Sequence, residues 1–138
     1  INTFACDSKD IDVLRRADDQ LLAMDVFFAA NRAAAHKFVC GHAPLFIKTA
    51  GEAKEYFNIT PAYRARIIDA MRRNGVREYL AAHHHGHYEV TDAGITVLTQ
   101  AATSFFVGKP APLGYYVFTL SPDGTKREFV EVQAAETP

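Results

Sequence analysis

VREYLAAHHHGH, residues 76–87, joins a short apolar run to a cluster of four histidines. The run over residues 76–82 predicts a β-strand, and the histidines lie where that strand ends. Alternate side chains of an extended backbone share a face, so we expect His83 and His85 to point towards one site and His84 to point away. This spacing is typical of a metal-binding histidine pair.

A further histidine, His42, follows a second predicted strand over residues 36–41, which ends at Gly-His-Ala-Pro because proline cannot continue a central strand. In α/β sheets, strand ends of one polarity meet at one edge, where ligands bind. We therefore expect His42, His83 and His85 to converge on a metal ion. Neutral imidazole binds zinc, iron, manganese, nickel or copper, so histidines alone do not select the metal.

The alternative interpretation is that these are surface-loop histidines without a ligand. From position alone we favour this ordinary role for His36, His84 and His87.

The composition indicates one ordinary globular domain over residues 1–138. The chain is 49% hydrophobic and 22% charged, with a formal charge of -1 and a pI near 6.6. A general nucleic-acid or membrane-surface binder would show a basic field, so neither class is expected. No apolar stretch approaches the roughly 20 residues that span a bilayer, because Asp25 and Asn31 interrupt the longest one.

The chain begins at Ile1 without an initiator methionine, and residues 1–6 have the pattern of a strand. We expect a piece of a longer precursor or a cleaved product. Export would explain this start, and fragmentation explains it equally well, so the compartment stays open. Cys6 and Cys40, in neighbouring predicted strands, are expected to be buried free thiols.

The remaining pattern predicts an α/β fold, a layered α+β arrangement with a mixed sheet. Helices are expected over residues 17–35 and 60–74, and a long loop over 47–59 is expected to cover the mouth of the site. The second helix carries arginines that we expect on its solvated face: Arg64, Arg66, Arg72 and Arg73. Antiparallel strands joined by Gly- and Pro-marked turns are predicted over residues 88–91, 95–100, 115–120 and 126–132.

These motifs resemble the C-terminal half of a calcineurin-like metallophosphoesterase, the superfamily that includes purple acid phosphatases. Gly41-His42-Ala43-Pro44 is similar to the family's G-H-x-P segment, and Ala82-His83-His84-His85 is similar to its G-H-x-H segment. The resemblance extends across most of the chain. It implies half of a metallophosphoesterase-type β-sandwich flanked by helices, with antiparallel C-terminal strands and with the N-terminal half absent.

The resemblance also implies roles for individual residues. His42 and His83 would bind one metal of a dinuclear pair, His85 would bind the other, and His84 or His87 would contact the substrate or leaving group as catalytic residues. The complete enzyme would hold two divalent or trivalent ions of iron, manganese or zinc. This chain alone would hold at most one.

Two departures from the family pattern matter. Ala82 replaces the family glycine before the histidine pair. The family's D-x-H, G-D-x-x-D and G-N-H segments, which supply the other ligands, belong to an N-terminal half that these 138 residues do not contain.

The function expected from the resemblance is therefore metal-dependent hydrolysis of phosphoesters, with the site completed by the missing N-terminal half or by a partner chain that covers a sheet edge. This fragment alone is expected to be inactive. The alternative is a non-catalytic interaction or structural subunit of a larger assembly that retains a degenerate fold. The expected substrate is a small phosphoester of unspecified identity.

Overall fold

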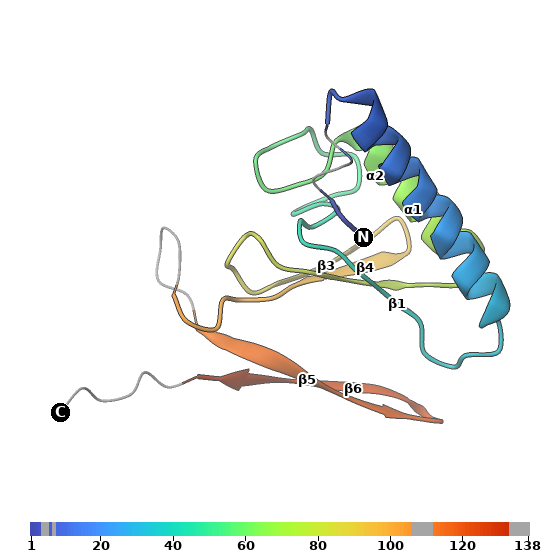
Figure 1. Ribbon diagram of the computed structural model, residues 1–138. Coiled ribbons are helices and arrows are strands. Elements are labelled where there is room, and N and C mark those ends of the chain that lie inside the picture. Colours follow the sequence, from blue (N-terminus) through green and yellow to red (C-terminus); the bar gives the residue numbers. More distant parts are fainter. Residues whose placement is uncertain (4–5, 7, 106–111, 133–138) are drawn as a thin grey trace.

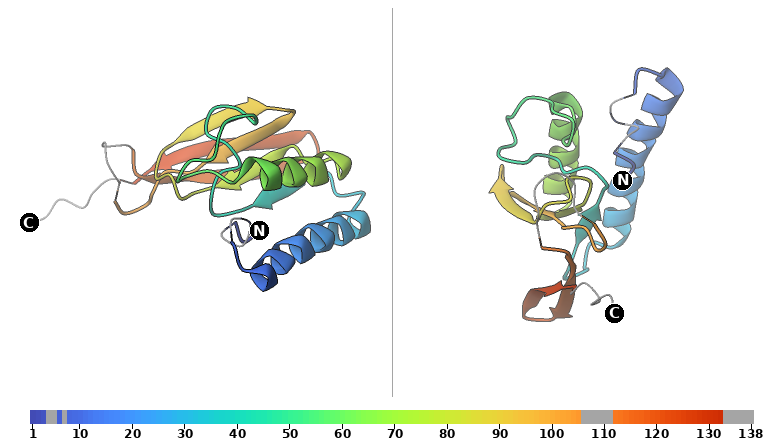
Figure 2. Two further views of the ribbon diagram at one scale, coloured as in Figure 1. Left: turned by 90° about the horizontal axis from the view of Figure 1, so that it is seen from above. Right: turned by 90° about the vertical axis from the view of Figure 1, so that its left-hand side faces the viewer.

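The computed structural model describes residues 1–3, 6, 8–105 and 112–132, and it places two helices on one face of a four-stranded sheet (Figure 1). A separate two-stranded hairpin lies on the opposite side of that sheet (Figure 2). The elements in chain order are α1 (Ile11–Ala30), β1 (Phe38–Cys40), α2 (Pro61–Arg73), β2 (Glu78–Ala81), β3 (Tyr88–Asp92), β4 (Ile95–Thr99), β5 (Gly114–Ser121) and β6 (Gly124–Glu131).

The four-stranded sheet has the order β1-β2-β4-β3. Strands β1, β2 and β4 run parallel, whereas β3 pairs antiparallel with β4. Strands β5 and β6 form the antiparallel hairpin. The predicted α+β fold with a mixed sheet and antiparallel C-terminal strands is thus confirmed.

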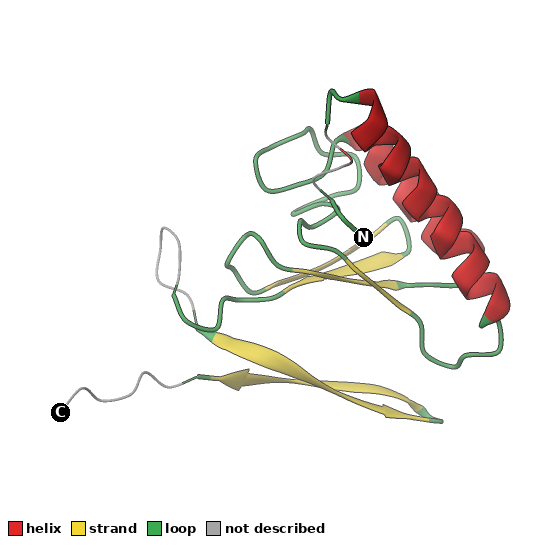
Figure 3. Ribbon diagram, viewed as in Figure 1, coloured by secondary structure: helices red, strands yellow, loops and turns green. Residues whose placement is uncertain are grey.

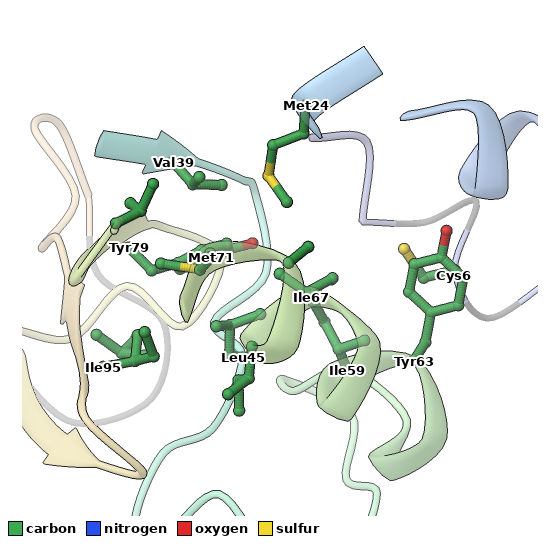
Figure 4. Close-up of a cluster of buried hydrophobic side chains, with 14 of the residues drawn as sticks. Cys6, Met24, Val39, Leu45, Ile59, Tyr63, Ile67, Met71, Tyr79 and Ile95 are labelled. Atoms are coloured by element: carbon green, nitrogen blue, oxygen red, sulfur yellow. The ribbon is translucent and has the colours of Figure 1, made fainter. Parts of the chain in front are cut away.

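The core lies between the helices and the sheet, because both helices turn an apolar stripe towards it (Figure 4). Helix α1 begins earlier than predicted, since the Asp10 side chain caps it by accepting hydrogen bonds from the N–H groups of Asp12 and Val13. Helix α2 begins as expected, with Pro61 in its first turn.

Three expectations about the chain's ends and burial were wrong. Residues 1–3 and 6 form no strand, and residues 4–5 lie outside the described part. Cys6 is buried but Cys40 is exposed, because Cys40 faces away from the helices, and both are reduced thiols. Arg64, which the sequence pattern placed on the solvent-exposed face of α2, is 0% exposed.

The loop predicted between β1 and α2 is present over residues 41–60 (Figure 3). In the described part of the chain, no helix is long and apolar enough to cross a bilayer.

The hairpin is attached to the sheet by a few specific contacts. The rings of Phe38 and Phe118 lie 5.7 Å apart, and Nε2 of His36 lies 2.7 Å from the Ser121 carbonyl oxygen. Arg127 pairs with Glu89. Between these contacts lies an apolar groove of about 270 Å³, lined by Phe38, Cys40, Leu80, Phe118 and Leu120.

Candidate metal centre

The sheet brings His42 and His83 together because β1 and β2 are adjacent and parallel. Backbone hydrogen bonds continue beyond the strands, from the Gly41 N–H to the Leu80 carbonyl at 3.0 Å and from the Ala82 N–H to the His42 carbonyl at 2.9 Å. His42 and His83 therefore both lie at the carboxyl ends of the parallel strands, as the polarity of the strands predicted.

One ring nitrogen of His42 lies close to one ring nitrogen of His83. Nε2 of His42 lies 3.1 Å from Nδ1 of His83, and the ring centroids are 4.8 Å apart. Two nitrogens that each lie about 2 Å from one zinc ion are separated by about 3 Å. The spacing therefore fits two ligands of one metal, and it also fits a hydrogen bond in which one ring donates to the other.

The backbone at the cluster is not extended, so the predicted alternation of side chains is wrong. His83 and His85 have φ angles of 60° and 54°, in the left-handed region that non-glycine residues rarely adopt. A residue held there costs about 1–2 kcal/mol. Backbone strain of this kind is concentrated at functional sites, which favours a functional role for this turn.

His85 does not complete a three-ligand site in the described residues. Its ring lies 5.3 Å from that of Phe105, and its Nδ1 is buried without a hydrogen-bond partner. Across residues 1–3, 6, 8–105 and 112–132, no group of three or more histidine, cysteine, aspartate or glutamate side chains is arranged to hold a metal. The described chain therefore offers a histidine pair and a third, nearby imidazole.

The neutral form is favoured for the rings of His83 and His84. Burial lowers the pKa of His83, and the neighbouring His42 lowers it further, although a hydrogen bond to the Tyr56 backbone acts in the opposite sense. Burial also lowers the pKa of His84. Neutral imidazole has the free lone pair that metal binding requires, so the local electrostatics suit ligation.

His84 and His87, the residues expected at the substrate, have different surroundings. His84 is half-buried, with its ring 4.5 Å from that of Phe57 and 4.7 Å from that of Tyr88. His87 is directed to the hairpin, where Nε2 contacts the Tyr116 hydroxyl and the ring lies 4.7 Å from that of Phe129. Of these two residues, His84 is the one that contacts Phe57, whose ring also lies beside His83.

A polar network around the half-buried Glu52 and the buried Arg64 shapes the loop beside the histidines. Glu52 accepts hydrogen bonds from the N–H groups of Ile47, Lys48 and Thr49. The guanidinium of Arg64 donates to the carbonyls of Ala50, Glu52 and Ile59. Sequence reasoning missed this network, because an arginine on an amphipathic helix ordinarily lies in solvent.

Sequence reasoning also missed the aromatic residues that this loop supplies. The Tyr56 ring lies 5.3 Å from the His83 ring, and the Phe57 ring lies 5.5 Å from it. The adjacent pair Tyr56-Phe57 was the available signal, because the other residues over 48–58 are polar or small.

Comparison of the sequence with curated proteins finds several similar chains. Serine/threonine-protein phosphatase CPPED1 from Rattus norvegicus is 28% identical over 106 residues, which are 77% of this chain and 34% of that protein. The human protein of the same name is 27% identical over 97 residues, or 70% of this chain and 31% of that protein. The chain thus spans about a third of the length of these relatives. No protein-family model matches it.

Comparison with solved structures supports the fold. GAP50, described as the anchor in the inner membrane complex of Plasmodium, superposes with a TM-score of 0.65 at 16% identity. The match covers 95% of this chain and 43% of GAP50. The fold is of the metallophosphoesterase-like type. The structural match thus shows the fold, and the sequence matches are to proteins that are named phosphatases.

Proposed function

We propose that this chain supplies the histidine side of the active site in a metal-dependent phosphoester hydrolase. The observation that carries the proposal is the 3.1 Å approach of His42 Nε2 to His83 Nδ1 at the ends of two parallel strands. The phosphatase names of the sequence relatives support the reaction class. A metal bound by this pair would act as a Lewis acid towards a phosphoryl oxygen.

The described residues have defined parts in this proposal. His42 and His83 would hold one metal ion of iron, manganese or zinc, and His85 would serve a second. The Tyr56 backbone orients the His83 ring through a hydrogen bond. His84 would lie at the phosphoester, whereas His87 is engaged by the hairpin and is the weaker candidate. The remaining ligands would come from the N-terminal part of the protein or from a partner chain.

The proposal is tested on the full-length protein with a generic aryl phosphate and added divalent metal. We expect hydrolysis that chelation abolishes and that His83→Ala lowers by at least about a hundredfold, the scale of losing a metal ligand or its support. His36→Ala is the matched control, because His36 contacts the hairpin and not the cluster. Activity that survives both chelation and His83→Ala would contradict the proposal.

A non-catalytic role in a larger assembly is the second candidate. It is favoured by the apolar groove between sheet and hairpin and by the lack of a third ligand in the described residues. The described role of GAP50 as an anchor shows that a protein of this fold can serve in an assembly. Co-migration of the chain with another protein in size-exclusion chromatography, without metal binding, would support this candidate.

A further inference from the structure

Exposed aromatic rings gather at the histidine cluster. Tyr56 is 78% exposed and Phe105 is 61% exposed. Tyr56 comes from the loop before α2, and Phe105 follows β4, so separate segments of the chain bring the two rings to the same histidines. Exposed apolar side chains that lie together mark places where a ligand or another molecule can bind.

Each ring is placed against a different histidine. The Tyr56 ring lies 5.3 Å from the His83 ring at an interplanar angle of 35°, and the Phe105 ring lies 5.3 Å from the His85 ring at 62°. Phe57 packs more deeply against His84, at 4.5 Å. Tyr56 and Phe105 thus leave much of their ring surface open beside the two histidines of the H-x-H segment.

Open rings beside a phosphoryl-binding site suit a flat, apolar leaving group. Aromatic rings associate in offset or edge-to-face arrangements and gain affinity beyond the area they bury. An alkyl ester, such as a phosphoserine side chain, has no ring with which to form these contacts. The chain contains no tryptophan, so tyrosine and phenylalanine are the residues that provide such surfaces.

We propose that Tyr56 and Phe105 bind the aromatic group of an aryl phosphate ester, with its phosphoryl group at His83 and His85; this rests on the proposed hydrolase function. Hydrolysis forms a bond from a water oxygen to phosphorus and breaks the bond from phosphorus to the phenolic oxygen. The protons of the water are divided between inorganic phosphate and the departing phenol. The substrate class is therefore an aryl phosphate, either a small molecule or a tyrosyl phosphate in a peptide.

The kinetic test compares phenyl phosphate with O-phosphoserine in the full-length protein. We expect Tyr56→Ala and Phe105→Ala each to raise the KM for phenyl phosphate about tenfold more than the KM for O-phosphoserine, the scale of one lost aromatic contact. Tyr115→Ala is the matched control, because Tyr115 is an exposed aromatic on β5. An equal effect on both substrates, or no effect, would overturn the proposal. A phosphotyrosyl peptide in the same assay separates the two sources of the aryl group.

A binding test separates this proposal from the function on which it rests. Tyr56→Trp in the full-length protein keeps an aromatic ring and adds a tryptophan to a segment of 138 residues that contains none, so the fluorescence difference from the wild type reports ligands at that position. Phenylphosphonate should change this fluorescence at concentrations at least about tenfold lower than methylphosphonate does. Equal responses, or none, would contradict the aromatic site. A selective response from a protein without hydrolytic activity would support the site and contradict the hydrolase.

Discussion

The position of His42 opposite His83 depends on the glycine that precedes His42 in the chain. Gly41 leaves room for the backbone to approach Tyr79, because a Cβ at this position would lie 1.9 Å from the Tyr79 hydroxyl oxygen and 3.0 Å from a Thr3 methyl carbon. The same Tyr79 hydroxyl donates a hydrogen bond to the Ala43 carbonyl, which fixes the chain immediately after His42. The glycine therefore allows a buried tyrosine to support the turn that carries the ligand.

Gly41→Ala tests this support. The added methyl group must displace the buried Tyr79, and overpacking of this kind destabilises folding by about 1–3 kcal/mol. Gly51→Ala is the matched control, since a Cβ there meets nothing within 4 Å and should change stability by less than about 0.5 kcal/mol. Urea denaturation of both variants measures the difference. Equal stabilities would show that Tyr79 moves aside freely.

At this scale the sequence predicted the meeting of His42 and His83, because strand polarity follows from the alternation of helix and strand. It could not predict the left-handed backbone of His83 and His85, since histidine does not specify that conformation as glycine does. Arg64 was misplaced for a related reason. Its partners are backbone carbonyls of a loop, which leave no mark in the sequence.

The element that most shapes the site is the loop between β1 and α2. The sequence indicates a loop there, but its conformation is fixed by Glu52. The carboxylate of Glu52 accepts hydrogen bonds from three loop N–H groups that have no strand or helix to pair with. The Asn58 amide donates to the same carboxylate at 2.7 Å. These bonds hold the segment that carries Tyr56 and Phe57 against the histidines.

The loop should make stability depend on pH. Burial acts to raise the pKa of Glu52, but hydrogen bonds from Asn58 and from three backbone N–H groups outweigh it and lower the pKa below its ordinary 4.5. A lowered folded-state pKa stabilises the fold above about pH 4.5, and that contribution is lost as the pH falls through the folded-state value.

Glu52→Gln isolates this contribution. The variant should be less stable than the wild type at pH 7, and the difference should shrink as the pH falls below 4.5. Denaturant midpoints between about pH 3 and 7 measure it. Glu55→Gln is the matched control, because Glu55 is an exposed carboxylate in the same loop. A wild-type advantage that stays constant with pH would contradict the role of Glu52.

The whole molecule has one well-covered face and one sparsely covered face. Two helices bury the first, whereas the second carries, among the described residues, the hairpin and the apolar groove that includes Cys40. The curated relatives are about three times as long as the matched segment. We propose that the remainder of the full-length protein covers this groove and the edge of β1, and that it supplies the other metal ligands.

The reactivity of Cys40 tests directly whether the groove is covered in the full-length protein. In this chain alone its exposed thiol should react readily with a maleimide, while the buried Cys6 should react slowly. In the full-length protein the labelling of Cys40 should slow by at least about tenfold, because a covered thiol is accessible to the reagent for only a small part of the time. Mass spectrometry of the labelled peptides distinguishes the two cysteines. Unchanged reactivity of Cys40 would show that the groove stays open.

The proposed hydrolase function requires above all that His42 and His83 share a metal ion. Long-range proton-nitrogen NMR of the histidine rings, with zinc titrated into this chain, identifies the ring nitrogens that bind. We expect the resonances of His42 Nε2 and His83 Nδ1 to shift together, while both ring nitrogens of His36 stay unchanged. Zinc-dependent shifts that leave either His42 or His83 unaffected, or no shifts at all, would contradict it.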